Sequence, residues 1–348
     1  MLAESRLRVL VTGASGNVGT ALLRRLVAED GVGEVAGVVR RPPAGGHQPY
    51  AQVRWHALDV AAPDSAPALA AAMVGVDAVV HLAWSIQPSH DEELMRRTNV
   101  EGTQRVADAA VAAGVPHLVH LSSVGAYSPG PQDRAVDESW PTDGVPTSRY
   151  CVHKAAAERV LDTVEASHPG LTVARVRPGL VMQHAAGSEI GRYFLGALLP
   201  KGWVGRWPLP LVPLPSGVQV QVVHADDLAD ALCRVILRRA RGAFNVAADP
   251  PVRAAHIAGA LRAARYLPVP WAPVRALTDL TWRLRLQPTD PGWLNLARHA
   301  PLMSTRRAHD ELGWSPVVPG PAALAELVPA IGAGAGAPSP VLAARMGE

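Results

Sequence analysis

Residues 6–19 read RLRVLVTGASGNVG, and this stretch decides the fold. The apolar run at 7–11 predicts a buried strand, and a helix is expected from about 17 to 29. Between them, Gly13, Gly16 and Gly19 predict a sharp turn whose backbone can approach a pyrophosphate at the N-terminus of the helix. Glycine triplets also occur in turns without a ligand, so the interpretation depends on the strand-turn-helix context.

The alternation of strands and helices continues from this turn to residue 180. The apolar runs are nearly continuous, as in parallel strands that are buried on both faces. The predicted fold class is therefore α/β, with a doubly wound parallel Rossmann sheet. Further strands are expected at 34–40, 52–58, 77–82, 117–122 and 171–176, and helices at 65–73, 91–113 and 149–166.

After residue 180 the βα rhythm gives way to a segment rich in glycine, proline and tryptophan. A strand that leads into an Asp-capped helix near 222–228, and a short strand at 242–247, return to the first pattern. We therefore predict a dinucleotide-binding domain of 1–180 plus 223–248 and a smaller, discontinuous substrate-binding subdomain of 181–222 plus 249–330. Residues 331–348, with alternating Gly and Ala before Pro-Ser-Pro, are expected to form a flexible tail.

The composition excludes several classes of protein. A net charge of +3 with scattered basic residues argues against a nucleic-acid partner, and no apolar run is long enough to predict a membrane span. The 13 histidines are dispersed without an HExxH pattern, so no metal site is expected, and no GxSxG motif follows a strand. Two cysteines and no recognisable signal peptide favour a reducing, cytoplasmic location.

The chain contains only two lysines, Lys154 and Lys201, and uses arginine at every other basic position. Tyr150 and Lys154 are four residues apart at the start of a predicted helix and so share one face. A free phenol ionises near pH 10, and a neighbouring ammonium would lower that pKa. The pair therefore predicts proton transfer by Tyr150, although an ordinary surface pair has the same spacing.

A serine pair lies where the fifth strand is expected to end, in the sequence Leu121-Ser-Ser-Val-Gly-Ala-Tyr127. A hydroxyl at this edge of a parallel sheet points into the crevice where ligands bind. We expect Ser123 to hold the substrate oxygen that Tyr150 protonates. Ser122 is the alternative, and either serine could simply cap the loop.

Together these features resemble the extended short-chain dehydrogenases/reductases of the NAD-dependent epimerase/dehydratase family. The matching motifs cover most of the chain: GASGNVG at 13–19, Asp59-Val60, His81-Leu-Ala83, TNVEGT at 98–103, Leu121-Ser-Ser123, Tyr150-x-x-x-Lys154, Arg177-Pro-Gly179 and VHADDLA at 223–229.

The resemblance implies an NAD(P)-dependent enzyme with Ser123, Tyr150 and Lys154 as its catalytic triad. It also implies that residues 81–83 line the cofactor and that Asn99 supports the active-site helix, although alone Asn99 would pass as a polar helix residue. Relatives often dimerise, so a homodimer is expected on analogy alone. The residues expected to bind the cofactor are Gly13, Ser15, Gly16, Asn17, Val18, Gly19, Arg40, Asp59, Val60, Leu82, Ala83, Asn99, Tyr150, Lys154 and Pro178.

The end of the second strand carries Arg40 and Arg41, where many NAD-binding folds place an acidic residue for the ribose hydroxyls. Since a guanidinium attracts a 2′-phosphate, NADP(H) is favoured over NAD(H), unless the two arginines are only solvated loop residues. Asp59, after the third strand, could accept a hydrogen bond from the adenine amino group or could cap a turn.

One departure from the family pattern bears on the substrate. Members that act on sugar nucleotides usually carry an RPxNxYGP-like segment, whereas residues 177–184 read RPGLVMQH. The segment that follows contains apolar residues such as Trp203, Trp207 and Leu211, which suit an apolar alcohol or carbonyl substrate or form the core of the subdomain. Arg192 and Arg206 could still meet a diphosphate, which keeps sugar nucleotides open.

The leading hypothesis is therefore a nicotinamide-dependent oxidoreductase that acts on a small molecule at a carbon bearing a hydroxyl or carbonyl group. Two alternatives stay open: a sugar-nucleotide epimerase or dehydratase, and a non-catalytic NAD(P)-sensing protein. The presence of both Tyr150 and Lys154 weighs against the second alternative, because binding proteins of this kind often lose one of the two.

Overall fold

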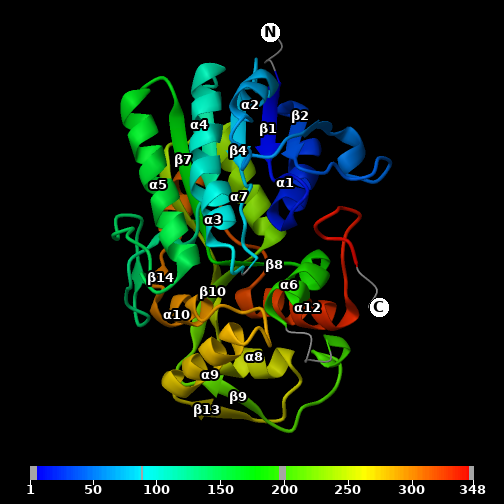
Figure 1. Ribbon diagram of the computed structural model, residues 1–348, viewed down its shortest axis with the longest axis vertical. Coiled ribbons are helices and arrows are strands. Elements are labelled where there is room, and N and C mark those ends of the chain that lie inside the picture. The colour runs from blue at the N-terminus through cyan, green and yellow to red at the C-terminus, as the bar shows by residue number, and fades with distance from the viewer. Residues whose placement is uncertain (1–5, 88, 196–200, 345–348) are drawn as a thin grey trace.

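The structure is a computed structural model that describes residues 6–87, 89–195 and 201–344. Its larger part is built on a sheet of seven strands in the order β11-β7-β5-β4-β1-β2-β3, and every pairing between neighbours is parallel (Figure 1). The doubly wound α/β sheet predicted from the sequence is confirmed. Its strands are β1 (Leu7–Thr12), β2 (Val32–Val39), β3 (Arg54–Ala57), β4 (Ala78–His81), β5 (His117–Leu121), β7 (Thr172–Pro178) and β11 (Gly242–Val246).

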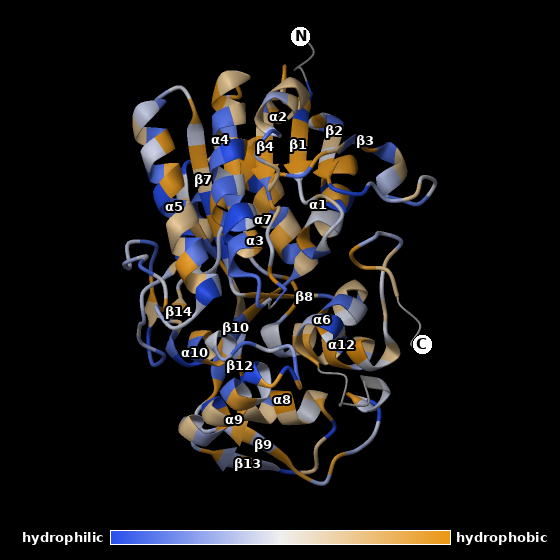
Figure 2. Cartoon of the chain, in the orientation of Figure 1, coloured by the Kyte–Doolittle hydropathy of each residue, from blue (hydrophilic) through white to orange (hydrophobic). Residues whose placement is uncertain are grey.

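Helices cover both faces of this sheet and bury separate apolar layers against it. One layer packs α1 and α7 against the strands and the other packs α2, α4 and α5, so the apolar ribbon of the sheet lies between them (Figure 2). The strand order reverses between β1 and β4, which is where doubly wound sheets open a ligand crevice. The helices are α1 (Asn17–Val27), α2 (Ala66–Ala72), α3 (Glu92–Arg96), α4 (Gly102–Ala112), α5 (Arg149–Ser167) and α7 (Ala225–Leu237).

The single helix expected at 91–113 is interrupted in the structure. A π-helical turn, Arg97–Glu101, separates α3 from α4 and turns the Asn99 side chain into the interior, where it is fully buried. Asn99 Oδ1 accepts a hydrogen bond from the Ser85 amide at 2.7 Å and Asn99 Nδ2 donates to the Ser85 carbonyl at 3.1 Å. The irregular turn thereby ties the helix to the loop that follows β4.

The smaller part lies beyond the carboxyl ends of the large sheet (Figure 1). Its strands form a three-stranded sheet, β12-β10-β8, and the pair β13-β9, while β14 pairs with β6. The strands are β6 (Ala135–Val136), β8 (Leu180–Met182), β9 (Val212–Pro215), β10 (Gln219–His224), β12 (Ala248–Arg253), β13 (Tyr266–Val269) and β14 (Leu302–Met303). Its helices are α6 (Gly187–Phe194), α8 (Ala254–Ala260), α9 (Trp271–Arg283), α10 (Gly292–His299) and α12 (Gly320–Ala333). A further helix, α11 (Arg306–Leu312), packs against β11 and α7 of the larger part. Across the described chain, short 3-10 turns occur at Tyr50–Gln52, Val124–Ala126, His184–Ala186 and Lys201–Trp203.

Two boundaries differ from those expected. Residues Ala308, Leu312 and Trp314, placed in the subdomain by the sequence pattern, belong to the core of the large sheet. Residues 331–344 do not form the extended tail expected from the sequence. Instead, α12 continues to Ala333, and the chain then packs back with Leu342 fully buried. Among the described residues, no helix combines the length and apolarity that crossing a bilayer requires.

Candidate active site

The glycine turn between β1 and α1 leaves no room for side chains. Gly13 has a φ of +69°, and a Cβ atom there would lie 2.7 Å from the Ala83 nitrogen. A Cβ at Gly19 would lie 2.4 Å from the Gly13 carbonyl oxygen. Gly16 precedes the first turn of α1 and supplies no side-chain cap, so backbone N–H groups of that turn remain available for an anion. These features fit the phosphates of a dinucleotide.

Other residues expected near the cofactor lie at the carboxyl ends of the neighbouring strands. The Leu82 and Ala83 amides donate to the carbonyl and the hydroxyl of Thr12, at 3.1 and 3.3 Å, which holds the loop after β4 against the glycine turn. Asp59 accepts a hydrogen bond from the Ala61 amide at 2.9 Å and so caps the turn after β3, which was the alternative to a role in binding adenine. Val60 and Pro178 are buried, and Arg40 is exposed after β2.

Two residues of the turn contact the smaller part of the molecule. The Asn17 carbonyl and side-chain oxygen accept hydrogen bonds from Gln183 Nε2 at 2.9 and 2.5 Å. The carbonyl of Ser15 accepts a hydrogen bond from Ser339 Oγ at 2.8 Å, and Ser339 is buried. The segment after α12 therefore closes against the glycine turn. No signal in its sequence predicted this contact.

The structure brings Ser123 and Tyr150 together at the end of β5. A Cβ at Gly125 would lie 2.9 Å from Tyr150 Cε1, so the loop that carries Ser123 packs directly on the Tyr150 ring. Ser123 Oγ accepts a hydrogen bond from the Gly125 amide at 3.0 Å. Burial raises the pKa of Tyr150 above its ordinary value, and a hydrogen bond with Ser123 opposes that rise.

Lys154 lies on the same helix, one turn after Tyr150. Its ammonium is buried, donates to the Leu121 carbonyl at 2.7 Å and lies 3.4 Å from the centroid of the Trp84 ring. The same nitrogen is 5.9 Å from the centroid of the Tyr150 ring. Burial lowers the pKa of Lys154 well below its ordinary value, and the charge of Glu158 opposes that effect.

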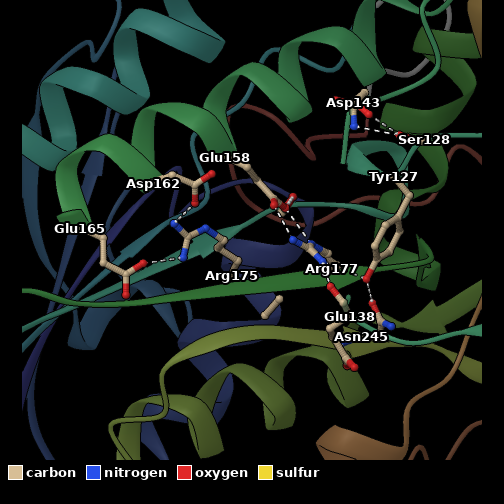
Figure 3. Close-up of polar contacts among 12 residues, drawn as sticks. Tyr127, Ser128, Glu138, Asp143, Glu158, Asp162, Glu165, Arg175, Arg177 and Asn245 are labelled. Atoms are coloured by element: carbon tan, nitrogen blue, oxygen red, sulfur yellow. Dashed lines mark hydrogen bonds and ion pairs between the residues drawn. The ribbon is translucent and has the colours of Figure 1, made fainter. Parts of the chain in front are cut away.

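Ser122, the alternative to Ser123, belongs to a different network. Its hydroxyl donates to Glu158 Oε1 at 2.5 Å. The Glu158 carboxylate also accepts two hydrogen bonds from Arg177, at 2.9 and 2.6 Å (Figure 3). Arg177 also donates to the Tyr127 hydroxyl at 3.0 Å, and that hydroxyl donates to Asn245 Oδ1 at 2.6 Å. Burial raises the pKa of Tyr127 to about 12, against the opposing charge of Arg177.

Three aromatic residues that the sequence analysis did not select lie around the Tyr150–Lys154 pair. The Trp293 ring packs on the Tyr150 ring with centroids 4.7 Å apart, and Phe194 meets Trp293 edge-on at 5.0 Å. Trp84 meets Tyr150 edge-on at 6.3 Å. Trp84 directly follows the His81-Leu-Ala83 motif and could have been found from it, whereas Phe194 and Trp293 lie in segments without a motif.

Some motif residues have structural roles only. His224 Nδ1 accepts a hydrogen bond from the Asp226 amide at 3.2 Å and so caps α7. The Asp227 carboxylate accepts hydrogen bonds from the Val317 and Val318 amides at 3.0 and 2.9 Å. This motif therefore holds α7 in place.

A mainly apolar cavity lies next to Val124 and Trp293, which are neighbours of Ser123 and of the Tyr150 ring, although neither Ser123 nor Tyr150 lines it. Its volume is about 60 Å³, and the amide groups of Gln219 and Gln221 on its wall are engaged in hydrogen bonds with the backbone or with Arg253. Trp203 and Trp207 are not on this wall; they are exposed to solvent. The cavity is lined by Val124, Leu180, Gln219, Val220, Gln221, Trp293, Leu296, Ala297, Ala300, Pro301 and Leu302.

Arg192, a candidate for binding a diphosphate, is engaged elsewhere. Its guanidinium donates to the carbonyls of Val341 and Ala343 at 2.5 and 3.3 Å and to Ser188 Oγ at 2.9 Å. Within the described ranges, no group of three or more His, Cys, Asp or Glu side chains is arranged to hold a metal ion.

A sequence profile of the NAD dependent epimerase/dehydratase family matches residues 9–247. The NAD-dependent glucose-6-phosphate dehydrogenase of Haloferax volcanii is 34% identical over 196 residues, which cover 53% of this chain and 72% of that protein. A 4-hydroxy-2-methyl-3-oxo-4-farnesyl-3,4-dihydroquinoline-1-oxide ketoreductase of Stigmatella aurantiaca is 32% identical over 181 residues, half of each chain.

The fold also matches solved structures. The Thermus thermophilus UDP-glucose 4-epimerase, solved in complex with NAD, superposes with a TM-score of 0.67 at 22% identity. The match covers 94% of this chain and 100% of the epimerase. At this level of identity the likeness shows a shared fold, which includes both the sheet and the smaller part.

Proposed function

Because the chain belongs to the NAD dependent epimerase/dehydratase family, we propose that it oxidises or reduces a small molecule at a carbon bearing a hydroxyl or carbonyl group. A nicotinamide dinucleotide bound at the glycine turn would supply the hydride donor or acceptor. The observation that carries the proposal is the meeting of Ser123 and Tyr150 at the carboxyl edge of the sheet, on the side of the glycine turn.

Each member of the triad has a distinct role in this proposal. Tyr150 transfers a proton to or from the substrate oxygen, and Ser123 holds that oxygen by a hydrogen bond. The positive charge of Lys154 stabilises the Tyr150 anion, and the Lys154 ammonium donates hydrogen bonds to the ribose hydroxyls of the cofactor. Since burial alone raises the pKa of Tyr150, the site needs such positive charge before Tyr150 can act as a base near neutral pH.

We favour NADP(H) as the cofactor. Arg40 and Arg41 are both exposed directly after β2, where a guanidinium attracts the 2′-phosphate of the adenosine ribose. Isothermal titration with NADPH and NADH tests this preference. R40A should weaken NADPH binding and leave NADH binding unchanged, whereas equal losses for both cofactors would contradict it.

We further propose an apolar alcohol or carbonyl compound as the substrate. The cavity beside Val124 is lined mainly by apolar side chains, and Arg192 is already bound to the segment after α12. The Stigmatella relative, a ketoreductase of a farnesyl-bearing compound, is in keeping with this choice. Sugar nucleotides are the competing class, represented by the UDP-glucose epimerase of the same fold.

The test is a turnover assay with NADPH and NADP⁺ against apolar ketones, apolar alcohols, UDP-glucose and glucose 6-phosphate. Y150F should reduce turnover at least about 100-fold while cofactor affinity stays within twofold. Turnover that survives in Y150F would refute the mechanism. Tight cofactor binding with no turnover of any compound would favour the NAD(P)-sensing alternative.

Two further expectations remain proposals. A cytoplasmic location is supported by Cys151 and Cys233, which are both buried and unpaired. A homodimer is expected on analogy with the family, and light scattering of the purified protein tests it.

A further inference from the structure

Trp84 is the nearest aromatic neighbour of the buried ammonium of Lys154. The ammonium nitrogen lies 3.4 Å from the centroid of the indole, well inside the range in which a cation is attracted by an aromatic face. The edge of the same indole meets Tyr150 at a centroid distance of 6.3 Å and His120 at 6.2 Å. One side chain therefore contacts both proposed proton-handling residues.

The contact with Lys154 is the main polar interaction of this indole. Trp84 Nε1 is buried and has no hydrogen-bond partner within the described part of the chain, although buried indole N–H groups usually find one. Its ring face, by contrast, lies against a full positive charge. Within the described residues, the indole therefore meets Lys154 through its ring face, while its own N–H donor stays without a partner.

Few other groups stabilise the charge of Lys154. On its own helix, the Glu158 carboxylate faces it but already accepts hydrogen bonds from Arg177 and Ser122. On β4 and β5, His81 and His120 are buried, and burial lowers the pKa of both, with Lys154 adding to that effect. Tyr150 lies one turn earlier on the helix, and the Leu121 carbonyl accepts the one hydrogen bond that the Lys154 ammonium donates within the described residues. The indole face is therefore the principal uncommitted partner of the ammonium.

We propose that Trp84 is a positioning residue for Lys154, whose indole face keeps the buried side chain charged and fixed beside Tyr150. The charge on Lys154 matters for catalysis only if the proposed function holds, whereas the contact itself is a property of the free protein. Removal of the indole would leave Lys154 with the hydrogen bond to the Leu121 carbonyl and the charge of Glu158. The ammonium would then lose its proton more easily, and Tyr150 would lose the charge that stabilises its anion.

The scarcity of lysine makes the contact directly measurable. Protein labelled with ¹³C only in lysine should give two sets of side-chain signals, and the K201R variant assigns those of Lys154. In the wild-type protein without cofactor, the ring current of Trp84 should shift the Lys154 Hε signals upfield. The absence of this shift would overturn the proposal without the need for any variant.

Two variants test the energetic role. In W84L the titration midpoint of Lys154 should fall by about one pH unit, and in W84F, which keeps a weaker aromatic face, by about half as much. W207F, at a solvent-exposed tryptophan, is the matched control and should leave the midpoint unchanged. Equal midpoints in the wild type and W84L would contradict the proposal.

The catalytic consequence is read from a pH profile. In the direction of alcohol oxidation, turnover should rise with pH as Tyr150 loses its proton, and W84L should move the midpoint of that rise upward. A purely structural role of Trp84 would lower turnover without moving the midpoint. If no substrate is turned over at all, the proposed function fails, but the lysine spectra still decide whether Trp84 holds Lys154.

Discussion

Two buried cations beside α5 are treated differently by the fold. Arg177 donates four hydrogen bonds, two to the Glu158 carboxylate, one to the Tyr127 hydroxyl and one to the Glu138 carbonyl, and its charge is balanced inside the protein. Lys154, four residues before Glu158 on the helix, makes one hydrogen bond to a carbonyl and lies against an indole. Both side chains are nearly inaccessible, at 5% and 2% exposure, so burial does not distinguish them.

The contrast distinguishes a buried cation that stabilises the fold from a buried cation that is available for catalysis. When a buried carboxylate accepts the hydrogen bonds of a buried cation, those donors are not available to a ligand. Removal of either the cation or the carboxylate then lowers the stability of the fold. A buried cation with few partners is held at a cost that a bound ligand can offset.

Removal of the carboxylate beside Arg177 should have the largest effect. E158Q keeps the shape of the side chain but leaves the Arg177 guanidinium buried without its counter-charge, so the free energy of unfolding should fall by about 3–5 kcal/mol. Urea denaturation followed by circular dichroism measures it. D162N, at an exposed partner of Arg175, is the control and should cost less than about 1 kcal/mol.

Removal of Lys154 should give the opposite pattern. K154M replaces the ammonium by an apolar group of similar length, so the free energy of unfolding should change by no more than about 1 kcal/mol. Turnover should fall about 100-fold or more, because Tyr150 then lacks the charge that stabilises its anion. If K154M destabilises the protein as strongly as E158Q does, the comparison between the two cations fails.

The chemistry that is local in sequence could be predicted from the sequence. The glycine turn, the Tyr150–Lys154 spacing and the serine at the end of β5 each depend on one strand or one helix, and the parallel sheet then collects them at one edge. The choice between Ser122 and Ser123 needed the structure, because adjacent residues point in different directions: Ser122 bonds Glu158, whereas Ser123 lies beside Tyr150.

What depends on distant segments could not be predicted. Trp293 reaches Tyr150 from α10, and Ser339 reaches Ser15 across 324 residues, so no local pattern encodes either contact. The repeated small residues near 332–339 resemble a linker in composition, yet Leu342 supplies the apolar side chain that anchors them. The position of Lys154 against Trp84 also follows from tertiary packing.

The smaller part contains a buried acid, Glu189, whose charge can be compared with those of the two buried cations. Burial raises the pKa of Glu189 on α6 from 4.5 to about 7, and a hydrogen bond with Tyr193 only partly opposes it. An acid whose pKa is raised on folding holds its proton more tightly in the folded state, so stability falls as the pH rises from 4.5 to 7. E189Q should therefore be more stable than the wild type by about 2 kcal/mol at pH 8.

Thermal unfolding over a pH series measures this difference. The gap between E189Q and the wild type should close as the pH falls to 4.5, where the carboxyl is protonated in the folded state. A gap that is equal at pH 8 and pH 4.5 would show that Glu189 acts through packing and not through its charge.

The smallest expected change in stability concerns His120, a buried histidine near Lys154. Burial lowers the pKa of His120 well below 6.5, with the charge of Lys154 adding to it, and neither ring nitrogen has a partner within the described residues. A base whose pKa is lowered on folding contributes stability above the unfolded pKa and loses it as the pH falls, because only the unfolded chain then binds the proton. In H120F this proton uptake is absent, so relative to the wild type it should gain about 1 kcal/mol between pH 7.5 and pH 5.5. Urea titrations at these two pH values measure the change, with H168Q at an exposed histidine as the control. Parallel changes in H120F and the wild type would show that His120 binds a proton in the folded protein as readily as in the unfolded chain.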